Sequence, residues 1–244
     1  MSQQPEPEPQ MSPSESSAVG SLLGLGLLLA VVLAALAAAT WFLARNRPLG
    51  IAASTHVAGA TMGTTYKVSL AGSLPEGVTR EEFHAEIERR LEAVNQWMST
   101  YRPDSEVSRF NESRGTDWYE VSHETALVVA EAQRISELSG GAFDITVGPL
   151  VNLWSFGPDN RPRAVPDEEE LAAAKAAVGY PLIEVRDAPP ALKKGRKDTA
   201  IDLSGIAKGF GVDQLASYLD EIGVLSYLVD IGGEMRAKGR KADG

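Results

Sequence analysis

The residues of this 244-residue chain best suited to chemistry lie in one glycine-rich turn. The run from Ala200 to Gly211, AIDLSGIAKGFG, predicts an apolar strand, a turn and then an amphipathic helix. A helix start offers unpaired backbone N–H groups and glycine lets the main chain approach an anion, so such a turn can hold a phosphate. Asp202 and Lys208 add one charge of each sign, which suits a divalent cation or a ribose or base donor beside the phosphate. The same pattern also serves as a plain packing turn, which is the competing interpretation.

Two other segments combine groups that suit a flat polar ligand. Residues 98–111 surround a proline with aromatic, hydroxyl and charged side chains, among which Tyr101 could stack on a ring. Residues 140–150 begin with two glycines, which free backbone groups for hydrogen bonds to a base edge. Asp144 in this segment would either contact the ligand or cap a turn. For both segments the competing interpretation is an ordinary surface loop.

Several other chemistries have no support in the sequence. The three histidines, His56, His84 and His123, lie far apart and predict surface or capping positions rather than a metal cluster. The chain has no cysteine, and it lacks a Gly-x-Ser-x-Gly elbow, a Walker loop and a GxGxxG pattern. Its net charge of −10, without a dense Lys or Arg run, argues against a nucleic-acid partner.

Strands alternating with helices are expected to position these segments within a layered α/β or α+β domain. A strand over 64–70 should follow a turn at 60–62 that Gly59 and Gly63 frame. A helix should begin at Thr79, which can form a capping box with Glu82. Its apolar residues recur at helical spacing on one inward face: Phe83, Ile87, Leu91, Val94 and Met98.

Three more helices and a strand are predicted further along the chain. One helix covers 123–139 and stops at Gly140–Gly141, and another follows Pro166, carries three glutamates at its positive end and stops at Gly179. The third follows the glycine-rich turn, and 226–231 predicts a buried strand after it. The apolar residues assigned to the inward faces are Val128, Ala132, Ile135 and Leu138 in the first of these helices, and Val212, Leu215, Ala216, Leu219 and Ile222 in the third.

The first 56 residues are predicted to lie outside the folded domain. Residues 1–18, rich in Pro, Glu, Gln and Ser, predict a disordered tail. Residues 19–44 are almost wholly apolar and would form about 39 Å of helix, which predicts one transmembrane anchor, with a linker over 45–56. A cleaved signal peptide is the alternative, because Ala37–Ala39 resembles a cleavage site. The two arginines after the anchor favour a cytoplasmic domain by the positive-inside rule.

Four motifs in one order resemble those of the FAD:protein FMN transferases, the ApbE family. They are MSTYRPDSE at 98–106, AFDITVGPL at 142–150, the turn at 202–211 and VDIGGE at 229–234. The resemblance covers about residues 57–239 and implies an α+β flavin transferase domain over 57–244, with FAD as substrate and magnesium at its pyrophosphate. In the implied reaction a threonine of an acceptor flavoprotein attacks the FMN phosphorus of FAD, and AMP leaves.

The resemblance also implies site residues. FAD contacts are expected at Met62, Tyr101, Ala142, Phe143, Asp144, Asp202 and Lys208. Gly205 is expected to give a main-chain carbonyl to magnesium, and glycine in place of the family's frequent alanine should matter little because the ligand is backbone oxygen. The general base that activates the acceptor hydroxyl is not identified.

The family pattern continues beyond the Gly232–Gly233–Glu234 turn to an aspartate and a threonine that bind magnesium and to a neighbouring histidine. We therefore expect this chain to be truncated at its C-terminus relative to the family, with weak metal binding of its own. Family members commonly act outside the cytoplasmic membrane, so we expect the single-pass anchor predicted at 19–44 to hold the domain on the periplasmic or outer face of that membrane. The resemblance also implies an acceptor in a respiratory or electron-transfer complex. The alternatives are a magnesium-dependent FAD pyrophosphatase and a non-catalytic FAD-binding protein.

Overall fold

The computed structural model describes residues 32–42, 54–158 and 164–241, in two compact units, 1–51 and 52–244. In the first unit residues 32–42 are helical and exposed. They are part of the predicted anchor at 19–44, whose other residues lie outside the described part, as do the predicted tail at 1–18 and most of the linker. No helix among the described residues is both long and apolar enough to cross a membrane. The anchor therefore stays a prediction.

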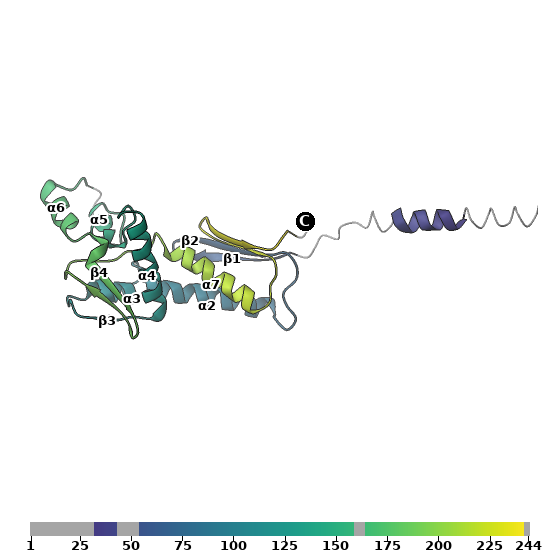
Figure 1. Cartoon of the computed structure of the whole chain (residues 1–244), viewed down its shortest axis with the longest axis horizontal. Helices are drawn as coiled ribbons and strands as arrows, with labels where there is room; N and C mark the ends of the chain where they lie inside the picture. Colours follow the sequence, from purple (N-terminus) through teal and green to yellow (C-terminus); the bar gives the residue numbers. More distant parts are fainter. Residues whose placement is uncertain (1–31, 43–53, 159–163, 242–244) are drawn as a thin grey trace, which may run out of the picture. The chain divides into compact units, whose positions relative to one another are not determined.

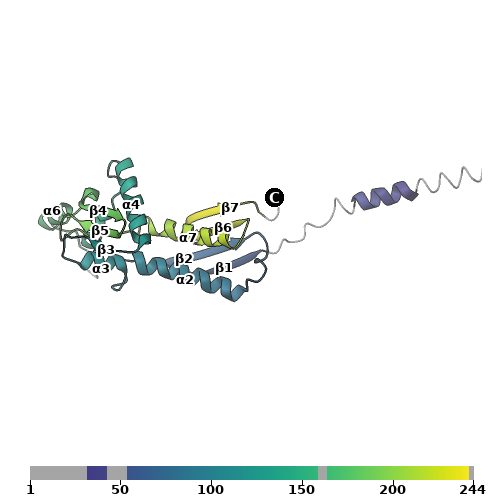
Figure 2. The same cartoon turned by 60° about the horizontal axis from the view of Figure 1, so that its bottom comes forward.

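One part of the second unit is an antiparallel sheet covered on one face by two long helices (Figures 1 and 2). The strand order is β1-β2-β6-β7. The elements are β1 (Thr55–Thr61), β2 (Thr64–Leu70), β6 (Tyr227–Ile231), β7 (Glu234–Lys238), α2 (Arg80–Met98) and α7 (Ala207–Glu221). The sheet joins the start of the domain to residues more than 150 positions later, because β2 pairs with β6 in a register that sets Tyr66 opposite Ile231.

Buried and more exposed side chains alternate along the central strands of this sheet. Tyr66, Val68 and Leu70 of β2 are buried while the residues between them are more exposed, so one face turns to the helices. Thr79 caps α2 in a capping box with Glu82, as predicted. The five apolar residues predicted to face inward from α2 are all buried.

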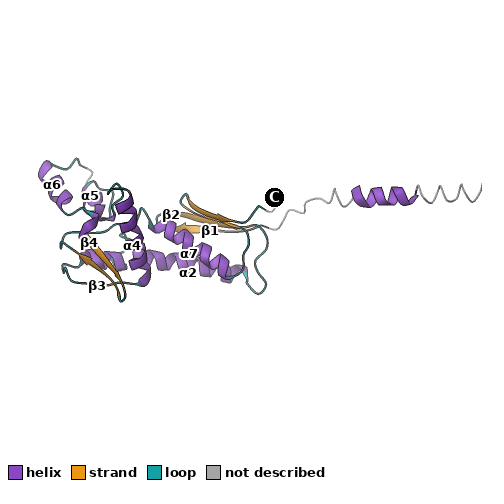
Figure 3. Cartoon of the chain, in the orientation of Figure 1, coloured by secondary structure: helices purple, strands orange, loops and turns teal. Residues whose placement is uncertain are grey.

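The other part of the unit is a smaller sheet with helices around it, of which α4 is the longest (Figure 3). Its strand order is β3-β5-β4. The strands are β3 (Tyr119–Glu120), β4 (Ile183–Asp187) and β5 (Pro190–Lys194), and the helices are α3 (Glu106–Glu112), α4 (His123–Leu138), η1 (Ile145–Val147), α5 (Gly148–Leu153), α6 (Glu168–Ala176) and η2 (Tyr180–Leu182). Helices and strands are segregated around antiparallel sheets, so the domain is α+β, as expected.

The structure corrects three local predictions. The β1–β2 turn is Met62–Gly63, both at positive φ, rather than 60–62, and Gly59 lies within β1. Leu138, the last residue of α4, is 74% exposed instead of inward-facing. The segment 98–111 is not all loop, since Ser105 caps a helix there, α3.

A fourth correction concerns the glycine-rich turn itself. The predicted strand before it is irregular chain that joins neither sheet, although Ile201 and Leu203 are fully buried. The helix after the turn begins at Ala207, and it buries the inward residues predicted for it except Ile222, which is only partly buried.

Candidate functional site

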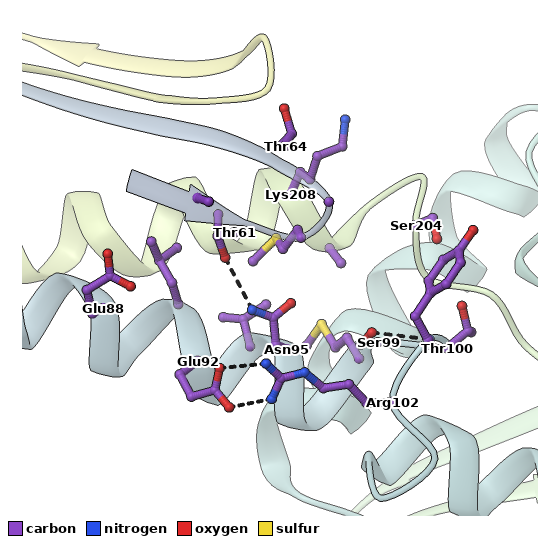
Figure 4. Close-up of a pocket in the computed structure, with 18 residues that line it drawn as sticks. Thr61, Thr64, Glu88, Glu92, Asn95, Ser99, Thr100, Arg102, Ser204 and Lys208 are labelled. Carbon is purple, nitrogen blue, oxygen red and sulfur yellow. Dashed lines mark hydrogen bonds and ion pairs between the residues drawn. The ribbon is translucent and has the colours of Figure 1, made fainter. Parts of the chain in front are cut away.

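A cavity of about 980 Å³ opens between α2, the β1–β2 turn and the start of α7 (Figure 4). Its lining residues come from segments that are distant in the sequence: Ala60, Thr61, Met62, Gly63, Thr64, Glu88, Leu91, Glu92, Val94, Asn95, Met98, Ser99, Thr100, Tyr101, Arg102, Ser204, Ala207 and Lys208. A volume of this order accommodates a large organic ligand. Of the predicted flavin contacts, Met62, Tyr101 and Lys208 line it.

Met62 reaches the cavity because of two backbone features. It has φ +48, an uncommon conformation for a residue with a side chain, and this turns the chain sharply at the end of β1. Gly211 of α7 lies under its side chain, where an added Cβ would come 3.0 Å from Met62 Cε and 3.2 Å from Ile231 Cδ1. Glycine at 211 therefore lets the turn pack directly on α7.

Lys208 brings a positive charge to the cavity from the first turn of α7. Its Nζ lies 2.7 Å from Glu234 Oε1 at the start of β7, and this hydrogen bond holds the pKa of the Glu234 carboxyl below its usual value. The other carboxylate oxygen of Glu234 is buried without a hydrogen-bond partner among the described residues. Lys208 is thus oriented by one partner and retains donors for an anionic ligand.

Tyr101 and Arg102 lie on a loop at the end of α2. Tyr101 is 64% exposed, and its hydroxyl donates to the Phe156 carbonyl at 3.0 Å. Arg102 forms a two-pronged ion pair with Glu92, one of whose contacts measures 2.8 Å. The loop is fixed beneath them, since Ser105 Oγ donates to the Ser99 carbonyl at 2.6 Å. An exposed ring on a fixed backbone suits stacking against a flat ligand.

The remaining predicted contacts do not line the cavity. Asp144 accepts from the Thr146 backbone N–H at 2.7 Å, from the Thr146 hydroxyl at 2.6 Å and from the Tyr180 N–H at 2.8 Å. Asp202 accepts from the Ser204 N–H at 2.8 Å. Both carboxylates therefore already organise turns in their own region.

The predicted contacts that do not line the cavity nevertheless lie close to one another. The Asp202 N–H donates to the Ile145 carbonyl at 2.7 Å, which joins the glycine-rich turn to the 142–150 motif. An added Cβ at Gly205 would come 3.2 Å from Phe143, so these two residues are in contact. Ala142 is exposed beside them. The sequence motifs thus meet in space, in two groups: Met62, Tyr101 and Lys208 on the cavity, and Ala142, Phe143, Asp144, Asp202 and Gly205 on the adjoining segments.

Sequence reasoning missed the polar face that α2 presents to the cavity. Glu88, Glu92 and Asn95 lie at spacings of four and three residues, hence on one side of the helix, and Asn95 Nδ2 donates to Thr61 Oγ1 at 3.2 Å. The spacing of these polar residues could have indicated a ligand-facing side of α2, but the same spacing is typical of a helix face exposed to solvent.

The donors present do not by themselves make a magnesium site. The described residues contain no group of three or more His, Cys, Asp or Glu side chains that could hold a metal ion. Magnesium prefers six oxygen ligands in a near-octahedral arrangement, and Gly205 would contribute one carbonyl. No chemical step is therefore assigned to a metal held by these residues.

The chain matches known proteins over the region that contains these motifs. A family model described as the ApbE family matches residues 62–244. The FAD:protein FMN transferase of Vibrio cholerae serotype O1 is 47% identical over 193 residues, 79% of this chain and 57% of that protein. The protein of the same name from Haemophilus influenzae is 46% identical over 191 residues, covering 77% of this chain and 55% of its own length.

Solved structures give the same result. The flavin transferase ApbE from Vibrio cholerae, as its H257G mutant, has a TM-score of 0.76 at 47% identity and covers 79% of this chain and 65% of that chain. The apo form of the Pseudomonas stutzeri flavinyl transferase ApbE has a TM-score of 0.74 at 38% identity, over 79% of this chain and 63% of that chain. This chain spans a little over half the length of the Vibrio and Haemophilus relatives. The match of its described fold, its motif region and its sequence shows that the chain belongs to the ApbE family.

Proposed function

We propose that this protein is a FAD:protein FMN transferase. The observation that carries the proposal is the agreement between its family membership and a cavity lined by residues of two motifs that the family resemblance singled out, Tyr101 and Lys208. The Vibrio and Haemophilus relatives are FAD:protein FMN transferases, and they share 46–47% identity with this chain over the matched region.

In the proposed reaction a threonine hydroxyl of an acceptor flavoprotein attacks the FMN phosphorus of bound FAD. The new bond is the P–O bond to threonine, the bond that breaks is the P–O bond of the pyrophosphate bridge, and AMP leaves with the bridging oxygen. The threonine proton passes to a base that the described residues do not identify. Lys208 would offset phosphate charge and Tyr101 would hold the isoalloxazine ring by stacking.

Magnesium dependence belongs to this proposal through the family resemblance. When bound, the ion would neutralise charge on the phosphate oxygens. Because the described residues offer Gly205 alone as a predicted ligand, its other ligands would come from water, FAD oxygens or groups outside the described residues. AMP release measured with magnesium and then with excess EDTA tests the requirement.

We also propose that residues 19–44 anchor the chain in the cytoplasmic membrane, with the domain on its periplasmic or outer face and the acceptor in a respiratory or electron-transfer complex. The apolar run supports the anchor, while orientation rests on the family resemblance and runs against the two following arginines. The orientation can be tested by fusing a reporter after residue 54. A reporter that fluoresces only in the cytoplasm and a second one that is active only outside it give opposite results for the two orientations.

The main experiment incubates the 244-residue chain with FAD and magnesium, with and without an acceptor domain carrying a threonine. Acceptor-dependent AMP release with FMN covalently attached to the acceptor is the expected result. A second candidate function is FAD binding without turnover, which the small metal-ligand set favours. FAD binding without AMP release would support that candidate, and AMP release with free FMN would instead indicate a pyrophosphatase.

A further inference from the structure

Asn111 makes the contacts that a neighbouring strand would make with the chain before the glycine-rich turn. Its Nδ2 donates to the Ile201 carbonyl at 2.8 Å, and the Ile201 N–H donates to Asn111 Oδ1 at 2.8 Å. Ile201 is fully buried and belongs to neither sheet. A buried backbone without partners is costly, so one side-chain amide here satisfies both polar groups of this residue.

Asn111 is itself held firmly. It lies on α3, and its own carbonyl accepts from Lys194 Nζ at 3.2 Å, while the Ser113 carbonyl accepts from the same nitrogen at 3.0 Å. Lys194 is 1% exposed on β5, with its Nζ 4.7 Å from the centre of the Phe110 ring. The end of α3 is therefore anchored to the smaller sheet, and the Asn111 amide extends from that anchor to Ile201.

The contact at Ile201 lies directly before the predicted flavin segment. Asp202 follows at once and donates its N–H to the Ile145 carbonyl at 2.7 Å. Gly205 then contacts Phe143, and Lys208 enters the cavity from the first turn of α7. A displacement of Ile201 would thus reach Asp202, the next residue, and Gly205, four residues after Ile201 in the chain.

We propose that Asn111 is a positioning residue for the flavin site, holding Ile201 so that Asp202 and the following turn take their binding geometry. The inference rests on the proposed function, because it assigns FAD as the ligand of that turn. Asn111 is the last residue of the segment 98–111, beyond the family-like motif at 98–106, and is absent from the cavity lining, so its role is indirect. Small displacements of binding groups weaken recognition strongly, which makes such a role measurable.

The test compares FAD dissociation constants of the full 244-residue chain and its variants, by quenching of flavin fluorescence well below the unfolding temperature. For Asn111→Ala we expect an increase of about tenfold or more, because both contacts with Ile201 are lost. Asn111→Asp keeps the acceptor for the Ile201 N–H but sets a carboxylate oxygen against the Ile201 carbonyl, so its dissociation constant should rise at least as much as that of Asn111→Ala. Asn111→Gln, which keeps the amide but moves it by one methylene, should also raise the dissociation constant and serves if the other variants do not fold.

A matched control separates positioning from general stability. Tyr227→Phe removes a hydroxyl that contacts the Ala216 carbonyl at 3.4 Å and Asp220 at 3.1 Å; Tyr227 begins β6 and does not line the cavity. It should lower the Tm while leaving the FAD dissociation constant unchanged. An unchanged dissociation constant in Asn111→Ala, with only a lower Tm, would show a merely structural residue and overturn the inference.

A double-mutant cycle tests the route of the effect. If Asn111 acts through the segment that carries Asp202, the loss of affinity in Asn111→Ala/Asp202→Ala should be smaller than the product of the two single losses. Multiplicative losses would contradict that route. A wild-type chain that does not bind FAD would overturn the proposed function together with this inference, whereas wild-type binding with unaltered Asn111 variants would overturn the inference alone.

Discussion

The two groups of predicted flavin contacts differ in what their polar atoms already do. Lys208 and Tyr101 line the cavity, and the side chain of each has one polar partner among the described residues, Glu234 and the Phe156 carbonyl. Asp144, away from the cavity, accepts three hydrogen bonds from its surroundings. Residues of one family pattern thus divide into groups available to a ligand and groups that shape the backbone beside it.

The largest expected effect lies in the second group. Asp144→Ala removes three hydrogen bonds to a carboxylate and leaves the Thr146 and Tyr180 donors unpaired, so we expect a loss of about 2–4 kcal/mol in the free energy of unfolding. Urea unfolding measures it. Asp167→Ala, which removes only the capping residue of the exposed helix α6, is the control and should cost about 1 kcal/mol. An equal loss of unfolding free energy in both variants would mean that Asp144 stabilises the fold no more than an ordinary helix cap.

The next effect belongs to the cavity group. Lys208→Met should weaken FAD binding by about tenfold to hundredfold, because the proposed charge-assisted contact with the FAD phosphates would be lost. Stability should change by only about 0–1 kcal/mol, because the pair with Glu234 is partly exposed. Calorimetric titration with FAD gives the affinity. Lys238→Met removes another paired lysine, bonded to Asp220 on the surface, and should leave FAD binding as it was. A stability loss without an affinity loss at 208 would move Lys208 into the structural group.

Tyr101 allows a sharper test of the cavity group, because removal of its ring and removal of its hydroxyl should change FAD binding by different amounts. Tyr101→Ala should weaken FAD binding by about tenfold through loss of stacking. Tyr101→Phe keeps the ring and loses only the exposed hydrogen bond to the Phe156 carbonyl, so its effect should stay within about threefold. The two variants can be titrated side by side with FAD. Equal losses would assign the contribution to the hydroxyl instead of the ring.

The smallest effect concerns Lys194, behind the structural group. Burial first, and then the charge of Arg114, lower the pKa of Lys194 to about 8. Between pH 8 and the ordinary lysine pKa the unfolded chain binds more protons than the folded one, so stability rises with pH in that window.

The expected result is that the wild-type chain gains about 1 kcal/mol in unfolding free energy over Lys194→Met between about pH 8 and 9. Urea unfolding of both proteins at a series of pH values measures the difference. Lys194 is 1% exposed, and Lys193→Met on the same strand, whose lysine is more exposed, provides the control. A difference that shrinks with rising pH would contradict a lowered pKa.

Much of the local structure could be predicted because its causes act over a few residues. Thr79 and Glu82 cap α2 from three positions apart, and the inward face of α2 follows from the helical period. The capping role of Asp144 in a turn was one of its two predicted interpretations, and its bond to the Thr146 N–H is of that kind. The order and composition of four motifs, in turn, were enough to suggest the family that the comparisons show.

Tertiary structure alone decided which of those motifs face the cavity. Met62 lies on α7 because β2 pairs with β6 and because Gly211 has no side chain beneath it, which are contacts between residues far apart in sequence. The strand predicted before the glycine-rich turn is not formed, and at Ile201 the Asn111 amide makes the two hydrogen bonds that a strand partner would make. Periodicity and capping act within one helix or turn, whereas the partner of a buried backbone group is chosen by packing across the whole domain.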